Sequence, residues 1–242
     1  LAEESFVLGG ILLGVGILFS CVVGPILFAG LKVLKPNEAL VLTLFGQYYG
    51  TLTGPGFFYV NPFVTAVNPA AQPAGALQSS SDPGTAALQA AGQGMTSGKK
   101  ISLKAMTLNN EKQKINDKLG NPIIIGIVVI WRVTNTAKAV FNVDNYKEFL
   151  SIQCDSALRN VVRLYPYDIS EDGDGVEEKS LRGSSQEIAD ILKEEIQKKV
   201  EIAGLEISEA RITHLAYAPE IAAAMLQRHQ ASAIIDARKL IV

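Results

Sequence analysis

The stretch IIIGIVVIWRV at residues 123–133 decides the fold class of this chain. It is dominated by Ile and Val, whose β-branched side chains favour strands. Its apolar residues fall at both odd and even positions, so both faces of the strand are apolar. A strand of that kind is buried in a sheet that is covered on both sides. We therefore expect residues 123–133 to form a core strand, with Trp131 as a core residue.

The core strand is expected to be one arm of a hairpin. The other arm lies in EKQKIN, residues 111–116, and residues 116–122 form the turn. Further upstream, residues 37–63 have the pattern of strand, turn and strand, punctuated by glycines and by a Gly-Pro-Gly triplet. Residues 99–108, KKISLKAMTL, resume strand alternation and place Ile101, Leu103 and Ala105 on one face.

Two helices and a last strand follow the core strand. The first helix is expected from about Asn145, which forms a capping-box pattern with Glu148. The second follows Ser184, which forms the same pattern with Glu187, and it ends at Gly204. The expected apolar stripes are Phe149, Ile152, Leu158, Val161 and Val162 on the first helix, and Ile188, Ile191, Leu192, Ile196 and Val200 on the second. Residues 205–215 form the last strand, so helices and strands are interleaved.

One internal segment differs in composition from its surroundings. Residues 65–98 consist mainly of Ala, Gln, Ser, Gly and Pro and show no hydrophobic period. Such a segment cannot bury enough apolar surface to offset the entropy cost of ordering it. We expect a disordered insertion.

The N-terminal segment has the strongest physical signal. Residues 6–31 contain no charged residue, and about 20 apolar residues suffice to cross a bilayer as a helix. Acidic residues precede the segment where a signal peptide has a basic region, so residues 1–32 are expected to be a retained membrane anchor. Gly24-Pro25 either kinks this helix or turns it into a hairpin. Lys32 and Lys35 follow the span. They favour a cell-membrane protein whose folded part lies on the cytoplasmic side.

Composition and motifs exclude several functional classes. The net charge is -2, which does not favour nucleic acid as a partner. Two cysteines do not make a disulfide framework. Residues 168–178 are acidic, but Ser170 and Lys179 occupy positions where a calcium-binding loop needs ligands, so a solvated loop is expected. His214 and His229 lie in no metal-binding or nucleophile motif. We expect no catalytic residue, no metal and no cofactor.

The chain ends in an alanine-rich helix that is expected to begin at Pro219. Its bulky and small apolar residues recur every seven positions, which is the coiled-coil period. The predicted contact seam consists of Leu226, Ala233, Ile234, Ala237, Leu240 and Ile241. We expect this seam to pack against neighbouring subunits. The alternative is an ordinary amphipathic helix that folds onto its own domain.

Four stretches together resemble one family. They are VLKPNEALVLTLFGQYYGTLTGPGFFYVNPF (33–63), KINDKLGNPIIIGIVVIWRV (114–133), LRNVVRLYPYD (158–168) and EARITHLAYAPEIAAAMLQRHQASAIIDARKLIV (209–242). Their order and spacing resemble the SPFH (band 7) family, in particular its bacterial stomatin- and prohibitin-like members. The insertion at residues 65–98 is a departure from the family pattern.

The resemblance implies an α+β fold in three parts. An anchor at 1–32 precedes an SPFH domain at 33–216, which has a strand-rich and an α/β subdomain, and residues 217–242 begin a long coiled-coil-like oligomerisation helix. It also implies a non-enzymatic scaffold that assembles with itself into a ring or cage on membrane lipids, organises membrane microdomains and regulates an AAA-type membrane protease. Two alternatives stay open: a tethered adaptor that binds a soluble partner through its acidic loop, and a tethered hydrolase that uses His214 or His229.

Overall fold

A computed structural model describes residues 16, 19–21, 23–71, 98–168 and 179–239. The chain divides into two compact units, Leu1–Lys104 and Ala105–Val242, here called unit 1 and unit 2. Residues 1–15, 17, 18 and 22 of the expected anchor at 1–32 lie outside the described residues, as do residues 72–97 and 169–178. Within the described ranges, none of the helices is both long enough and apolar enough to cross a membrane.

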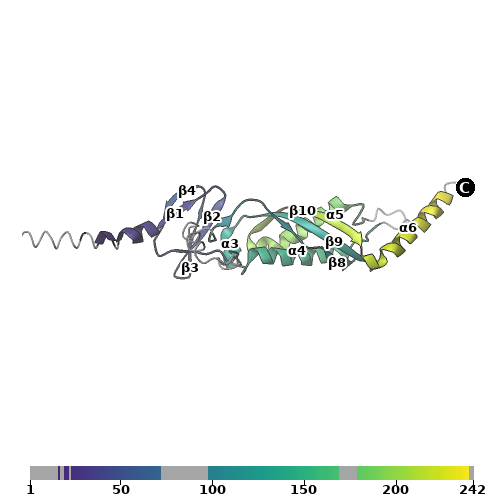
Figure 1. Cartoon of the computed structure of the whole chain (residues 1–242), viewed down its shortest axis with the longest axis horizontal. Coiled ribbons are helices and arrows are strands. Elements are labelled where there is room, and N and C mark those ends of the chain that lie inside the picture. Colours follow the sequence, from purple (N-terminus) through teal and green to yellow (C-terminus); the bar gives the residue numbers. More distant parts are fainter. Residues whose placement is uncertain (1–15, 17–18, 22, 72–97, 169–178, 240–242) are drawn as a thin grey trace, which may run out of the picture. The chain divides into compact units, whose positions relative to one another are not determined.

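The described part of unit 1 contains a helical stretch at residues 23–29 and six short strands, four of which are labelled in Figure 1. The strands are β1 (Leu31–Leu34), β2 (Glu38–Leu44), β3 (Gln47–Thr53), β4 (Gly56–Tyr59), β5 (Thr65–Ala66) and β6 (Ile101–Ser102). β1 pairs with β4, while β2 pairs with β3 on one edge and with β5 and β6 on the other, all antiparallel. The core of the unit is a cluster of buried aliphatic side chains, Leu34, Leu40, Leu42, Val60 and Val64.

The structure corrects the expected start of the insertion. Thr65 and Ala66 form β5, and the Thr65 hydroxyl lies 3.0 Å from the Thr43 hydroxyl on β2. Asn68 donates its side-chain amide to the carbonyls of Gly98 and Lys100, at 3.1 and 3.0 Å. The first residues of the range 65–98 are therefore ordered, because β2 offers an edge that a composition-based prediction does not see.

The single strand expected over residues 99–108 is also wrong. The structure has two strands there, β6 and β7 (Met106–Asn109), and they belong to different sheets. Ile101 is fully buried in unit 1, whereas Ala105 is exposed. The regular alternation of the sequence continues across the boundary between the two units, which is why it suggests one strand.

Unit 2 combines one antiparallel sheet with helices. Its further strands are β8 (Gln113–Asn116), β9 (Pro122–Val133) and β10 (Leu205–Tyr217), in the order β10-β9-β7, with β8 also paired to β9. The helices are α3 (Thr136–Phe141), α4 (Tyr146–Val162), α5 (Ser185–Val200), the 3-10 turn η1 (Glu201–Ala203) and α6 (Pro219–Lys239). The fold is thus mixed α and β, as expected.

β9 confirms its expected role in the core, but on one face only. Its odd-numbered residues, Ile123, Ile125, Ile127, Val129, Trp131 and Val133, are 0–4% exposed. They belong to the core that α4 and α5 complete, and the Trp131 ring meets the Tyr146 ring of α4 edge-on at 6.1 Å. The even-numbered Ile124, Val128 and Ile130 are only partly buried. The expectation of a sheet covered on both faces is therefore wrong for one of them.

The two predicted capping boxes have different outcomes. Asn145 caps α4, since its side-chain oxygen accepts bonds from the backbone N–H groups of Lys147 and Glu148. Ser184 precedes α5 but makes no side-chain cap bond, and Glu187 instead forms an ion pair with Lys179 at 2.7 Å. Lys179 thus binds the carboxylate of Glu187, which the capping-box pattern predicts to accept a bond from the backbone N–H of Ser184.

The expected apolar stripe of α4 is partly wrong. Leu158, Val161 and Val162 are buried, but Ile152 is 56% exposed and the fully buried positions of the first turns are Leu150 and Cys154. The stripe of α5 is confirmed at Ile188, Leu192, Ile196 and Val200, which are all buried.

Gly204 connects the helical layer to β10 in a conformation that suits glycine. Its φ is 64°, and a Cβ there would lie 2.5 Å from the Asn135 carbonyl oxygen. The Gly204 carbonyl accepts bonds from the backbone N–H groups of Thr134 and Asn135, both at 3.0 Å. The close approach therefore holds the start of β10 against the end of β9.

Replacing Gly204 with Ala should destabilise unit 2 by about 3 kcal/mol, since a left-handed residue with a Cβ costs ~1–2 kcal/mol and overpacking costs ~1–3 kcal/mol. The matched control is Gly120→Ala, because Gly120 has a φ of 83° but open space around it, and we expect a loss of about 1 kcal/mol. Urea unfolding followed by the fluorescence of Trp131, the single tryptophan, measures both. Equal losses would show that the contact with Asn135 does not matter.

Candidate functional site

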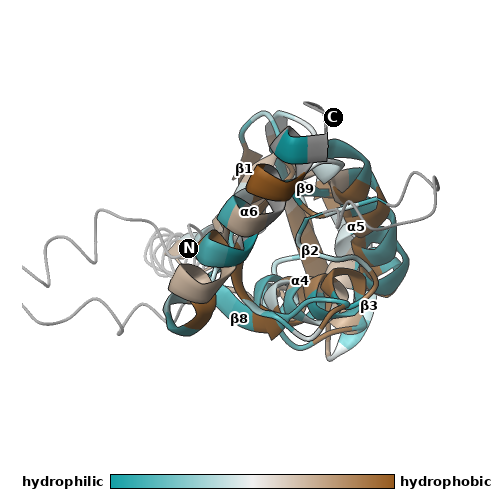
Figure 2. Ribbon diagram, turned by 90° about the vertical axis from the view of Figure 1, so that its right-hand side faces the viewer, coloured by the Kyte–Doolittle hydropathy of each residue, from teal (hydrophilic) through white to brown (hydrophobic). Residues whose placement is uncertain are grey.

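The final helix α6 has no buried side chain among those that the structure describes. Apolar and polar stretches alternate along it (Figure 2). Leu226, Ile234 and Ile235 are 59%, 55% and 54% exposed. Isolated helices are marginal in water, and most helical stability in proteins comes from packing one apolar face. This helix of 21 residues therefore presents a surface that is suited to another protein chain.

The start of α6 is held firmly although its length is exposed. Pro219 is its first residue, as predicted, and Ala218 donates its N–H to the Pro122 carbonyl at 2.9 Å. Glu220 in the first turn forms an ion pair with Lys114 of β8 at 2.6 Å. The first turn of α6 with the preceding Ala218, here called the root of the helix, is thus fixed to the β8–β9 hairpin.

A ring stack supports the same root from the side. Tyr217, the last residue of β10, lies with its ring centroid 4.0 Å from that of Tyr167. The backbone N–H of Tyr167 donates to the buried carboxylate of Asp117, which also accepts bonds from the turn between β8 and β9. Burial, with the charges of Asp117 and Asp168 nearby, raises the pKa of Tyr217 to about 12. Tyr217 therefore stays neutral at physiological pH.

The predicted seam is only partly within the described structure. Leu226 and Ile234 lie on α6 with exposed side chains. Ala233 and Ala237 lie in the same helix, but their side chains are outside the description, and Leu240 and Ile241 follow the described part of the chain. The contact of this seam with neighbouring subunits stays a prediction.

A second surface lies on β1 and β4 and was not predicted from the sequence. The strands pair Leu31 with Tyr59 and Val33 with Phe57, and paired residues project from the same face. These four side chains are 44–79% exposed. The opposite face carries Leu34 and Phe58 of the core. This outer face of β1 and β4 is entirely apolar and directly follows the apolar segment at residues 6–31.

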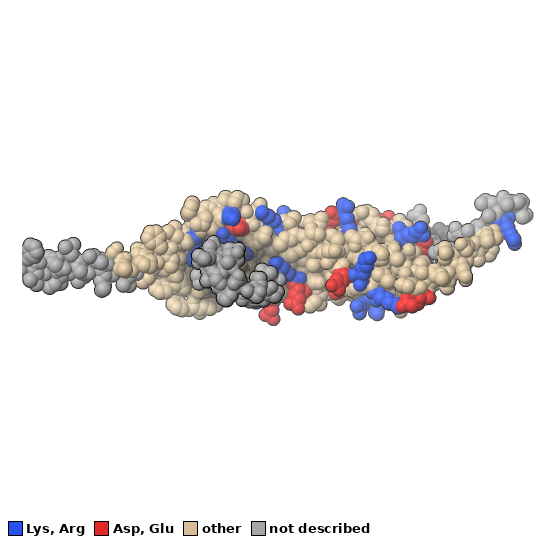
Figure 3. All heavy atoms as spheres, in the orientation of Figure 1, with Lys and Arg blue, Asp and Glu red and all other residues tan. Residues whose placement is uncertain are grey.

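Charge is distributed unevenly over the described residues. In the view of Figure 3, acidic and basic side chains are scattered along unit 2, whereas few are visible over the strands of unit 1. Glu38 is the one acidic residue among the described part of unit 1. The hydrogen bond from Lys100, 2.9 Å away, lowers the pKa of its carboxyl. The surface of unit 1 near β1 and β4 is therefore poor in negative charge.

The tip of the β2–β3 hairpin breaks a local rule of backbone geometry. Its two turn residues, Phe45 and Gly46, both have positive φ, 49° and 85°, which is the requirement of a type I′ turn. Asn or Gly is favoured at the first position, and a bulky residue there is an outlier. Phe45 is nevertheless 89% exposed. Strained positions of this kind cluster at functional sites.

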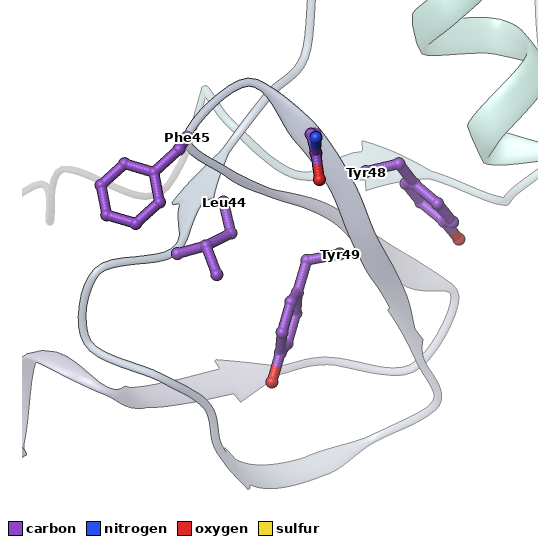
Figure 4. Close-up of a pocket in the computed structure, with 5 residues that line it drawn as sticks. Leu44, Phe45, Tyr48 and Tyr49 are labelled. Atoms are coloured by element: carbon purple, nitrogen blue, oxygen red, sulfur yellow. The ribbon is translucent and has the colours of Figure 1, made fainter.

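Three more aromatic or aliphatic side chains surround this tip. Leu44, Tyr48 and Tyr49 line, with Phe45 and Gln47, a shallow cavity of about 320 Å³. Figure 4 shows the Phe45 ring pointing away from the strands at the turn, while Tyr48 and Tyr49 project to opposite sides of β3. Amphipathic aromatic rings of this type are enriched where proteins meet the membrane–water interface.

The structure describes the side chain of one of the two histidines that the hydrolase alternative would use. His214 lies on β10 opposite Gly126 of β9, and the His229 side chain is outside the description. Among the described residues, no group of three or more His, Cys, Asp or Glu side chains is arranged to hold a metal ion. Cys154 lies on the buried face of α4, and burial together with the charge of Asp155 raises its pKa to about 12.

Comparison with known protein families agrees with this architecture. The family described as "SPFH domain / Band 7 family" matches residues 32–240. The chain belongs to the SPFH (band 7) family, which is in general a family of membrane-associated scaffold proteins and not of enzymes. Comparison with curated proteins finds no match.

The exposed apolar residues of unit 1 have sequence patterns that were not used to predict a surface site. Leu31 and Val33 alternate, as do Phe57 and Tyr59, but only their strand pairing places all four on one face. Phe45 precedes a glycine in a two-residue turn, where Asn is the usual choice. A large apolar residue at this turn position is the sequence feature that could have indicated the exposed tip of the hairpin.

Phe45→Asn should stabilise the β2–β3 hairpin by roughly 1 kcal/mol, because Asn tolerates positive φ better than Phe and little packing is lost at an exposed site. Hydrogen exchange of the β2 and β3 amides in detergent measures this change, with Gln47→Asn as a control outside the strained positions. Lower protection in the Phe45 variant would mean that the ring stabilises the hairpin, and would remove the argument from strain.

Proposed function

We propose that this protein is a membrane-anchored scaffold whose subunits assemble into a large ring or cage through α6. The observation that carries the proposal is the exposure of α6, which begins at a well-defined root yet buries none of its described side chains. The seven-residue spacing of Leu226, Ala233 and Leu240 suits packing of this helix against copies of itself.

The second part of the proposal concerns unit 1. Its apolar β1–β4 face and the Phe45 tip rest on the bilayer, in continuity with the apolar segment at residues 6–31. Burying exposed apolar surface contributes about 25 cal/mol per Å², and the scarcity of acidic side chains in the described part of unit 1 avoids repulsion from anionic lipids. Unit 1 then holds the base of the assembly on the membrane surface.

The finer role follows from this arrangement. An assembly of anchored subunits delimits a patch of membrane, and in this proposal it organises a membrane microdomain and regulates an AAA-type membrane protease within it. The body lies on the cytoplasmic side of the cell membrane, in line with Lys32 and Lys35 directly after the apolar segment. No catalytic step is assigned to the protein.

Replacing Leu226 with Glu should collapse the assembly, because a charge in a helix seam is costly to bury. Ile235→Glu is the matched control: its side chain is equally exposed but lies outside the predicted seam. Light scattering after size-exclusion chromatography of the detergent-extracted protein measures the particle mass. We expect a reduction to small species for the first variant and the wild-type mass for the second.

The opposite outcomes are informative. A wild-type protein that runs as a monomer would reject the scaffold and favour an adaptor that binds a soluble partner. A large wild-type particle that tolerates Leu226→Glu but not Ile235→Glu would keep the scaffold and place the helix contact on another side of α6.

The membrane contact of unit 1 has its own test. A polarity-sensitive label on Phe57→Cys, in a Cys21→Ala background, should shift to shorter wavelength in liposomes and be quenched by bromine on the lipid chains. A label on Ser208→Cys, an exposed position of β10 in unit 2, should do neither. Equal spectra from the two sites would reject the lipid contact of β1 and β4.

A further inference from the structure

One face of the sheet in unit 2 has an apolar centre that its own chain leaves partly open. The side chains of Ile124, Val128 and Ile130 on β9 are partly exposed, while the odd-numbered residues of the same strand are fully buried against the helices. An ordinary solvent-facing sheet surface alternates polar residues at such positions. These three residues, here called the β9 stripe, are therefore suited to burial against something else.

The register defines what surrounds the β9 stripe. Ile130 lies between Thr107 and Glu209, and Val128 between Asn109 and Arg211. Ile124 lies between Lys114 and Ala216. The flanking strands thus contribute mainly polar side chains around an apolar centre. Protein interfaces have this arrangement of an apolar core and a polar rim.

Three of the rim cations, Arg132, Arg211 and Lys114, are already paired within the chain. Arg132 binds Glu206 with two nitrogen atoms, Nε at 3.1 Å and Nη2 at 2.9 Å. Arg211 pairs with Glu209, and Lys114 with Glu220. A surface whose charges are neutralised locally can be covered without leaving an unpaired charge, which would be costly. The partner therefore needs an apolar contact with a polar surround, not an opposite net charge.

The other side of unit 2 carries a feature of that kind. Ile152 is 56% exposed on α4, and the helical repeat places it opposite the buried residues Leu150 and Cys154. Its neighbours on the same side of the helix, Glu148 and Ser156, are exposed and polar. Ile152 is thus an apolar side chain with a polar surround, on the outside of the helix layer.

The dimensions of the two surfaces agree. α4 has 17 residues and is roughly 26 Å long, while the β9 stripe spans seven residues, or about 20 Å. The sheet is three strands wide and up to 13 residues long, so its open face measures roughly 600 Å². A stable interface buries about 800 Å² per partner, so this face supplies most of one.

We propose that α4 of a second copy of this chain covers the β9 stripe, with its Ile152 at the centre of the contact. This inference rests on the self-assembly proposed above and names a surface for it outside α6. The contact joins two different surfaces on opposite sides of unit 2, so it repeats head to tail, and repeats of that type form a ring when the rotation between neighbours closes and an open filament when it does not. Each sheet then has helices on both faces, one layer from its own chain and one from its neighbour.

Cross-linking distinguishes this contact from others. In the full-length chain with Cys21→Ala, the double variant Val128→Cys/Ile152→Cys is oxidised in the membrane and run on a non-reducing gel. Residues on opposite sides of the unit cannot bridge within one chain. Cys154 stays in place, because its raised pKa of about 12 leaves almost no reactive thiolate.

We expect a ladder of dimers, trimers and larger species from the double variant, and at least tenfold less product from either single variant. Dimers from Val128→Cys alone would show two sheets face to face and overturn the proposal. The absence of cross-links from a particle of full mass would also overturn it, while leaving the scaffold intact. A wild-type monomer would instead reject the scaffold itself.

A charge variant gives a second measurement that does not depend on cysteine chemistry. Val128→Lys should reduce the particle mass, and Gln186→Lys, at an exposed position of α5 outside both proposed surfaces, should not. Circular dichroism and Trp131 fluorescence check that both variants are folded. A folded Val128→Lys protein that keeps the full particle mass would count against the contact.

Discussion

Burial of the odd-numbered face of β9 is the constraint on which the rest of unit 2 depends. Each fully buried Ile or Val side chain contributes on the order of 1.5–3 kcal/mol. Five such residues and Trp131 occupy every second position of the strand. This burial fixes the register of β7, β8 and β10, because a slip of one residue would turn the apolar set outwards. The end of β10, and hence the root of α6, is placed by the same constraint.

The sequence predicted this part of the structure well because its signals are local. The β-branched run identified β9, the glycines marked the turns, and Asn145 identified the start of α4. The failures arise where a residue outside the local pattern competes. Lys179 takes the carboxylate of Glu187 from the helix end, and β2 offers its edge to Thr65. Neither contact has a signature in the residues that were used for the prediction.

The exposed surfaces were harder to predict than the core, for a different reason. Apolar periodicity indicates that a residue is buried, but it does not indicate which element or partner buries it. The pattern of buried positions includes Ile124, Val128 and Ile130 of β9 and, on the α6 seam, Leu226 and Ile234, and the structure of one chain leaves these five side chains at least partly accessible. The outer face of β1 and β4 was missed because it depends on the pairing of residues 24 to 28 positions apart, Val33 with Phe57 and Leu31 with Tyr59. Such departures from local rules concentrate at places that interact with something else.

The pairing of β6 with the beginning of β2 sets an order of events during synthesis. Glu38 and Ala39 pair with Ser102 and Ile101, so part of the β2 edge has no partner until residue 102 has left the ribosome. Chains elongate at ~5–20 residues per second, so the 34 residues after Ala66 delay that step by seconds. An apolar strand with an open edge is prone to wrong pairing in this interval. The length of the segment between β5 and β6 therefore acts on the yield of folded protein more than on the folded structure.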